Sequence, residues 1–237
     1  MEYKPSDPES YNKAVKLLRD LGMRDKCEGE WCFVHFTARE PRGGERGFVR
    51  ITVDGLRYIG WLALHGDERA WWLKEMLLKE AKAKGKEARR RLEQYFREGE
   101  MWGRVKPPVE REVEVEGKKV RVRVEEVEAW REKSEKKKEH LVVKVRAKVI
   151  EGSSEVTLEK EARFYKESDG EINGYVNIYA SVEGGREADY MRTAAVLKTL
   201  GVEKWRRQKG QILLTGSALD ALMRLEPVCA ALGICQK

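Results

Sequence analysis

Two stretches of the chain place chemically active side chains close together. The first, ESDGEINGYVNIYAS, sets the carboxylates of Asp169 and Glu171 on either side of a glycine. Carboxylate oxygens hold Mg²⁺ against the scissile phosphate in two-metal nucleases, so this pair could form a catalytic metal site. The preceding EVTLEKEARF alternates with period two and predicts a strand, after which SDGE is an ordinary turn sequence. The context favours the turn.

The second stretch, EKWRRQKGQILL, gathers cations around a tryptophan at the start of a predicted hairpin. After Glu203 it has no acid, and its candidate contact residues are Lys204, Trp205, Arg206, Arg207 and Lys209. A strand of this kind can enter the major groove of DNA, where arginine reaches guanine edges and tryptophan packs on sugar or base. A solvated edge strand, protected by its charge against aggregation, would have the same composition. Both interpretations stay open.

A further basic run, KAKGKEARRR, is predicted to be helical. Its cations are Lys82, Lys84, Lys86, Arg89, Arg90 and Arg91. Cations at this density on a helix usually form a solvated face, which is the favoured interpretation, although they would also serve as a phosphate-contacting stripe.

Glycines precede a helix in EGGREADYMRT. Free amides at Gly184 and Gly185 could hold a phosphate. We expect Glu187 and Asp189 to satisfy this positive helix end instead.

The cysteines occur as two close pairs, Cys27 with Cys32 and Cys229 with Cys235. Both spacings are wider than the CxxC of zinc sites, which argues against zinc. Intracellular proteins of hyperthermophiles are an exception to the rarity of disulfides in cytosol. A local disulfide within a pair is therefore favoured over a metal, with free buried thiols as the default.

The remaining reactive side chains show no catalytic pattern. His35, His65 and His140 are scattered, and no Ser-His-Asp arrangement, phosphate-binding P-loop or Rossmann glycine pattern occurs. Trp71 and Trp72 are adjacent on a predicted helix, and we expect them to pack in the core.

Similar elements are predicted near the two ends of the chain. YNKAVKLLRDLGM and EADYMRTAAVLKTLGV have apolar residues at helical spacing and stop at Gly22 and Gly201. GFVRITVDGLRYIGWL then aligns with GQILLTGSALDALMRL, Thr52 lying over Thr215. Each end therefore predicts a helix, a hairpin and a second helix, through duplication or through chance similarity.

The middle of the chain predicts one or two long helices, interrupted near Gly85, and then a five-stranded antiparallel meander. The predicted fold class is α+β, with two terminal αββα units flanking a helix and an antiparallel β-meander. The expected parts, joined as one or two intimately packed domains, are 1–100 (αββα unit plus long helix), 101–182 (meander) and 183–237 (αββα unit).

Composition narrows the class of protein. Charged residues make up 38% of the 237 residues and Asn and Gln are scarce, as in proteins from hot environments. The net charge of +7 favours a polyanionic partner. No stretch approaches the roughly 18 apolar residues of a membrane span, and MEYKPSDPES has no apolar signal core. We expect a cytoplasmic protein without a membrane partner.

Residues 169–225 resemble the part of LAGLIDADG homing endonucleases that follows their motif helix. The shared features are an acidic DGE, an alternating strand, a helix ending in Leu-Gly, a basic hairpin and a closing helix. The resemblance implies a saddle-shaped sheet in the DNA major groove, with metal-holding acids at the ends of two motif helices. Only Asp169 or Glu171 qualifies as that acid here, since the other half offers no matching acid except Asp67 in GWLALHGDE. Because no motif helix with small packing residues precedes Asp169, the resemblance supports DNA binding better than cleavage.

From about Gly47 onward the chain also resembles the Pyrobaculum repeat family, subfamily two-b, of uncharacterised archaeal proteins. DGLRYIGWLALHG, the meander and GGREADYMRTAAVLKTLG carry this resemblance, which matches better in length and order than the first. It implies a hyperthermophilic source and a mobile or regulatory element, but no established activity.

The leading hypothesis is a nucleic-acid-binding protein without catalytic activity, on a homing-endonuclease-like scaffold. Duplex DNA is the expected partner, with RNA as an open alternative, and no cofactor is needed. The second hypothesis is an active DNA endonuclease that uses Mg²⁺ at Asp169 or Glu171, and the third is a protein-interaction module of a hyperthermophile. Monomer and homodimer are both admissible.

Overall fold

The computed structural model describes residues 1–4, 7–25, 33–133, 139–167 and 171–235. Within these ranges the chain forms two compact units, Met1–Met101 and Trp102–Lys237. Both combine helices with strands, which confirms the predicted α+β class. None of the helices in these ranges is both long enough and apolar enough to cross a bilayer.

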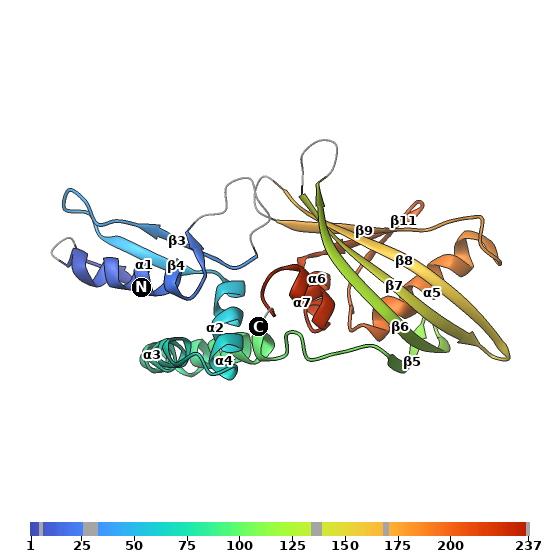
Figure 1. The fold of residues 1–237 in the computed structure, drawn as a ribbon, viewed down its shortest axis with the longest axis horizontal. Coiled ribbons are helices and arrows are strands. Elements are labelled where there is room, and N and C mark those ends of the chain that lie inside the picture. Colours follow the sequence, from blue (N-terminus) through green and yellow to red (C-terminus); the bar gives the residue numbers. More distant parts are fainter. Residues whose placement is uncertain (5–6, 26–32, 134–138, 168–170, 236–237) are drawn as a thin grey trace. The chain divides into compact units, whose positions relative to one another are not determined.

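The first unit joins a small mixed sheet to four helices (Figure 1). The sheet has the order β1-β4-β3-β2, in which β2 and β3 are parallel and the other neighbours antiparallel. Its strands are β1 (Glu2–Tyr3), β2 (Arg24–Asp25), β3 (His35–Arg39) and β4 (Gly47–Ile51), and its helices are α1 (Pro8–Asp20), α2 (Val53–Leu64), α3 (Glu68–Lys84) and α4 (Lys86–Glu100).

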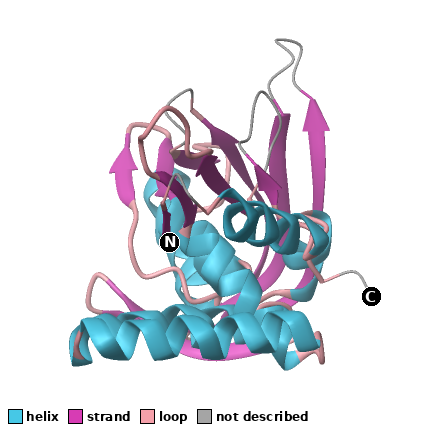
Figure 2. Ribbon diagram, turned by 90° about the vertical axis from the view of Figure 1, so that its left-hand side faces the viewer, coloured by secondary structure: helices cyan, strands magenta, loops and turns pink. Residues whose placement is uncertain are grey.

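Glycines set the arrangement of the long helices. Gly85 has φ +119° and separates α3 from α4, which confirms the predicted interruption; the two helices then lie side by side (Figure 2). A Cβ at Gly60 or Gly99 would collide with the facing backbone of α4 or α2, so these two helices approach closely. Between them Arg57 binds Asp54 at 2.8 Å and Glu98 at 2.7 Å.

Trp71 and Trp72 do not pack in the core, so that prediction is wrong. The two side chains are 57% and 55% exposed. On α3 the buried residues are Ala70, Leu73 and Ala81, which recur at helical spacing. Because each helical residue is turned about 100° from the previous one, this stripe leaves the neighbouring tryptophans outside it. The phase of the apolar stripe outweighs the size of the aromatic side chains.

The second unit is built on one curled antiparallel sheet of seven strands (Figure 1). The order is β10-β11-β9-β8-β7-β6-β5. The strands are β5 (Val109–Val115), β6 (Lys118–Lys133), β7 (Glu139–Glu151), β8 (Ser154–Lys166), β9 (Ile172–Asn177), β10 (Arg206–Gln208) and β11 (Gln211–Thr215), and the helices are α5 (Gly185–Thr199), α6 (Gly216–Leu222) and α7 (Glu226–Ala231).

The predicted meander corresponds to β5–β9, but the sheet does not end there. β11 pairs along β9 from Gln211 opposite Asn177 to Thr215 opposite Asn173, and β10 follows as the last strand. This pairing satisfies the row of N–H and C=O groups that β9 would otherwise expose. The C-terminal hairpin is therefore an extension of the meander.

The inner face of this sheet forms the core of the second unit. Period-two alternation sends Val122 of β6 and Val143, Val145 and Val149 of β7 to one side, where the helices cover them. Helix α5 is buried over most of its length and contributes Ala194, Ala195, Val196 and Leu197. Strand alternation thus decides which face receives the helix.

A buried ion pair fastens α5 to the sheet. Lys160, on β8, is 7% exposed and Asp189, on α5, is fully buried. Lys160 Nζ lies 2.5 Å from Asp189 Oδ2, which also accepts the Tyr179 N–H at 2.7 Å. Lys160 in addition donates to the Asn177 carbonyl at 3.3 Å. The pair therefore ties together β8, the end of β9 and the second turn of α5.

The two predicted Leu-Gly helix ends share one backbone geometry. Gly22 and Gly201 have φ +86° and +87°, and the leucine before each has φ −80° and ψ 0°. Both parts then form a hairpin whose second strand pairs with the strand that precedes the helix, β1 or β9. Thr52 caps α2 by accepting the Gly55 N–H at 3.1 Å, whereas Thr215 makes no such side-chain bond.

We expect Asp189→Asn to destabilise the second unit strongly, because it leaves the Lys160 ammonium buried beside a neutral amide. A loss of about 3–5 kcal/mol is typical for such a change. The joint replacement Lys160→Met with Asp189→Leu should cost less, since no buried charge remains. Guanidinium unfolding monitored by circular dichroism measures both.

The control is Lys144→Met with Glu159→Leu, an ion pair of 3.0 Å whose side chains are 31% and 57% exposed. It should change the unfolding free energy by no more than about 1 kcal/mol. A loss for Asp189→Asn as small as this control would show that the buried pair does not hold α5.

Candidate nucleic-acid interface

The basic hairpin lies at the free edge of the seven-stranded sheet. β10 is the first strand in the order, and β11 is its neighbour in the described structure. The side chains of Lys204, Arg206 and Lys209 are exposed. Within the described ranges these three make no hydrogen bond or ion pair. They are therefore available to an external anion.

Arg207 differs from its neighbours because it is docked on α5. Its Nη1 donates to Glu187 Oε1 at 3.0 Å and its Nη2 to Glu187 Oε2 at a shorter distance. The guanidinium carbon lies 4.1 Å from the centre of the Tyr190 ring. The hydrogen bond from Arg207 lowers the pKa of Glu187, and the same bond raises the pKa of Arg207. Arg207 thus fixes the hairpin against the helix.

Trp205 also contacts α5. It is half-buried, and its Nε1 donates to the Tyr190 hydroxyl at 3.3 Å. Tyr190 itself is 6% exposed. One tyrosine therefore receives both the tryptophan and Arg207, and the first strand of the hairpin is held in place without the use of Arg206 or Lys209.

A cavity of about 300 Å³ lies between this hairpin and the start of α5. Three cations line it, Arg186, Arg207 and Lys209, together with the amides of Gln208 and Gln211. Guanidinium and ammonium groups around amide donors are a suitable lining for a phosphate group.

The sequence did not predict that three residues of α5 contact the hairpin or line the cavity beside it: Arg186, Glu187 and Tyr190. Arg186 and Tyr190 are four residues apart on α5 and so share one helix face. That spacing was readable from the sequence, but the helix had no assigned neighbour. Only the packing of α5 beside β10 identifies what this face meets.

The centre of the sheet shows the opposite charge pattern. Lys144 pairs with Glu159 at 3.0 Å, and Lys148 pairs with Glu155 at 2.8 Å, across the adjacent strands β7 and β8. Cross-strand pairs of this kind neutralise both charges in place. The exposed cations at the β10 edge have no such acids opposite them in the described structure.

The other basic run is split and partly neutralised. Arg89 binds Glu93 at 2.7 Å, and Arg90 and Arg91 both bind Glu87 at 3.1 Å, all within α4. The exposed lysines lie on both sides of the break between α3 and α4 and, in the described part of the chain, have no ion pair: Lys82, Lys84 and Lys86. This arrangement favours a solvated face for the arginines.

The candidate metal acids Glu171 and Asp67 each have a described contact within their own unit. Asp169 lies outside the described residues. Glu171 is exposed, and its carbonyl accepts the Glu167 N–H at 2.8 Å across the β8–β9 connection. Asp67 caps α3, and its pKa is lowered by the hydrogen bond from Arg69. Among the described residues, no group of three or more His, Cys, Asp or Glu side chains could hold a metal.

Glu187 lies in the first turn of α5, as expected of an acid near this helix end, but neither Glu187 nor Asp189 caps the helix with a side-chain hydrogen bond. Gly184 begins the helix without a side-chain hydrogen bond. The Glu187 carboxylate binds Arg207, and the Asp189 carboxylate binds Lys160. Both acids are used in longer-range contacts that local spacing does not reveal.

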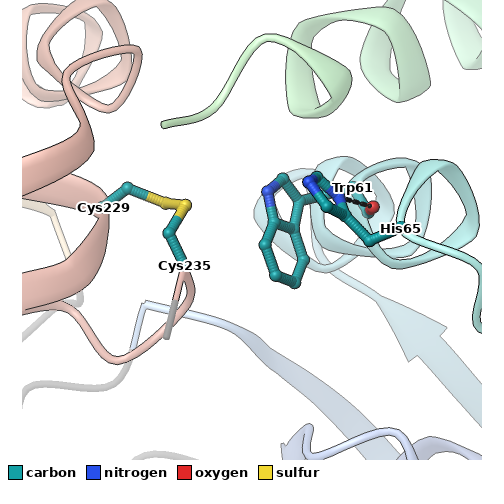
Figure 3. The surroundings of a disulfide bond; sticks show 4 residues. All are labelled: Trp61, His65, Cys229 and Cys235. Atoms are coloured by element: carbon teal, nitrogen blue, oxygen red, sulfur yellow. Dashed lines mark hydrogen bonds between the residues drawn. A yellow bond between two sulfur atoms is a disulfide. The ribbon is translucent and has the colours of Figure 1, made fainter. Parts of the chain in front are cut away.

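Cys229, within α7, and Cys235, after it, form a disulfide with a Cα–Cα distance of 5.3 Å (Figure 3). The structure thus has a local disulfide here in place of the free thiols that were the default expectation. Cys27 and Cys32 lie outside the described residues.

The described contacts of His65 and His140 are structural. In the first unit His65 Nδ1 lies 2.8 Å from the Trp61 carbonyl oxygen, one turn earlier in the helix (Figure 3). In the second unit the His140 ring lies 5.9 Å from the ring of Tyr165 on the adjacent strand. These contacts position rings within a helix and a sheet.

Comparison with known proteins gives one match. A protein family described as PaRep2b protein matches residues 35–236. No curated protein and no solved structure matches the chain. The resemblance to LAGLIDADG homing endonucleases therefore receives no support from these comparisons.

We expect Arg207→Ala to raise the pKa of Glu187 toward that of an ordinary glutamate, because the depressed value depends on this guanidinium. A depressed folded-state pKa stabilises the fold above the unfolded-state pKa, and this contribution is lost as pH falls through the folded value. Carbon-detected NMR titration of the Glu187 carboxyl measures the shift. Arg206→Ala is the matched control and should leave it unchanged; an equal rise in both variants would contradict the pairing.

Proposed function

The chain belongs to the PaRep2b protein family, and we propose that it binds nucleic acid, in the first place duplex DNA, through the hairpin β10–β11. The observation that carries this proposal is the set of exposed, unpaired cations Lys204, Arg206 and Lys209 at a free sheet edge. Each cation that neutralises a phosphate releases a condensed counterion, which favours association.

The geometry of the hairpin suits a groove. The major groove admits a two-stranded β-ribbon. Along β10, Arg206 and Gln208 share one side of the strand and Arg207 occupies the other, where it is engaged with α5. Arg206 and Gln208 are thus free to approach base edges, arginine suiting guanine and glutamine suiting adenine.

We also propose that the two helix–hairpin–helix parts are copies of one αββα unit on a homing-endonuclease-like scaffold. Their matching Leu-Gly ends and strand pairings support duplication. Binding without cleavage is the favoured form of the function, because Asp67, the acid that would serve the first half, is engaged as a helix cap by two N–H groups and Arg69.

The experiment is a salt titration of binding to a labelled DNA duplex, with wild type and the double variant Lys204→Ala, Lys209→Ala, which removes the two hairpin cations that are not assigned to base edges. The slope of log affinity against log salt should become shallower by about 2, since about 0.9 is lost per phosphate contact. Stability should be unchanged, because neither side chain has a described partner.

Lys144→Ala with Lys148→Ala removes the same charge from the centre of the sheet, where both lysines are paired with acids, and is the matched control, expected to keep the wild-type slope. No wild-type binding at low salt would refute the proposal, and an unchanged slope in the hairpin variant would remove these residues from the interface. Single-stranded DNA and RNA serve as competitors. Incubation with Mg²⁺ and a denaturing gel should show uncut DNA; specific cutting would favour the endonuclease.

A protein-interaction module is the second candidate, and the exposed Trp71 and Trp72 favour it. Large exposed aromatic side chains are typical of protein contacts, and these two are more than half exposed. If they join two copies of the chain, sedimentation equilibrium should show a dimer for wild type and a monomer for Trp71→Ala with Trp72→Ala. A wild-type monomer over the whole concentration range would exclude self-association.

A further inference from the structure

A second cavity, of about 640 Å³, lies at the open end of the curled sheet. The turns of the β5–β6 and β7–β8 hairpins border it on one side and the first turns of α5 on the other. Its volume falls within the range of about 300–1,000 Å³ that small-molecule sites occupy. The cavity is therefore large enough for an organic molecule.

The floor and one wall of this cavity are apolar. Val115 is 4% exposed and Val149 is fully buried, while the half-buried Val120 continues the floor along β6. Ala188 and Met191 form the wall on α5. Contact with such a surface favours an apolar or aromatic body, and methionine adapts its shape to irregular ligands.

A buried charged side chain borders the apolar part. Arg192 is 7% exposed and donates from Nε and Nη2 to the Glu151 carboxylate at 3.2 and 3.0 Å. Its Nη1 donates to the Glu183 carbonyl at 2.8 Å. These bonds use three of the five N–H groups of the guanidinium. Arg192 and Glu151 thus cancel in charge, and two of the five N–H groups take no part in these bonds.

The rim carries uncompensated positive charge. Lys118 and Lys119, at the start of β6, are exposed and have no hydrogen bond or ion pair among the described residues. The remaining acid of the lining, Glu187, is bound to Arg207. An anionic group near the two lysines would therefore meet attraction, reduced by Glu114, which lies opposite Lys119 in the register of β5 and β6.

We propose that this cavity binds a small organic anion with an apolar body. The body lies on Val115, Val149 and Met191, and the anionic group faces Lys118 and Lys119. This site is distinct from the proposed hairpin contacts with nucleic acid, and it does not depend on them.

The test uses anilinonaphthalene sulfonate, an aromatic anion whose fluorescence rises in apolar surroundings. The background is Trp71→Ala with Trp72→Ala, so that the exposed tryptophans do not bind the dye. We expect one dye molecule per chain. Lys118→Gln with Lys119→Gln should weaken dye binding about tenfold, which corresponds to a loss of about 1.4 kcal/mol in binding free energy. Lys82→Gln with Lys84→Gln is the matched charge control and should bind as the background does.

Ala188→Phe should abolish dye binding by filling the cavity, with circular dichroism as the check on folding; Met191→Trp replaces it if the first variant does not fold. Retained binding in a folded, filled variant would overturn the site. Phenylnaphthylamine, which lacks the sulfonate, should bind more weakly than the anion. Equal affinity for this neutral dye, or no effect of the lysine replacements, would overturn the preference for an anion.

Discussion

The second unit depends on the buried ion pair of Lys160 and Asp189. Both charges lose their hydration on burial, so the pair is stable only when the two side chains meet in one geometry with their hydrogen bonds satisfied. The Tyr179 N–H and the Asn177 carbonyl add hydrogen bonds to the pair, whereas Asp189 Oδ1 has no hydrogen-bond partner in the described structure. This requirement favours a single position of α5 on the sheet. This single position of α5 also fixes the side chains of α5 that contact the hairpin and those that line the larger cavity.

The charged residues of this chain differ in whether they form ion pairs, and this difference separates two explanations of the high charge. A content of 38% charged residues could reflect adaptation to heat alone, and the cross-strand pairs of β7 and β8 fit that explanation. The exposed cations Lys204, Arg206 and Lys209 of the hairpin and Lys118 and Lys119 of β6 differ, because they form no ion pair in the described structure. Both groups lie where strands end or lack a neighbour, which leaves them accessible to an external anion.

Local sequence rules succeeded where the determining contacts are local. Strand alternation, the helix ends at Gly22 and Gly201 and the break at Gly85 were predicted, since each depends on neighbours within a few residues. The pairing of β11 with β9 and the contacts of Glu187 and Asp189 were not, because they join segments far apart in sequence. For the same reason composition located the cations of the hairpin, while the helix face that meets them required the fold.

Glu187 links the two proposed sites. Its carboxylate binds Arg207 of the hairpin and also lines the larger cavity, where the charge of Lys118 contributes to its lowered pKa. An anion near Lys118 alters the field at this carboxylate, and a phosphate at Arg207 competes with it. Linkage is reciprocal for binding free energies. If an anion in the cavity changes the affinity of the hairpin for nucleic acid by some factor, then bound nucleic acid must change the affinity of the cavity for the anion by the same factor.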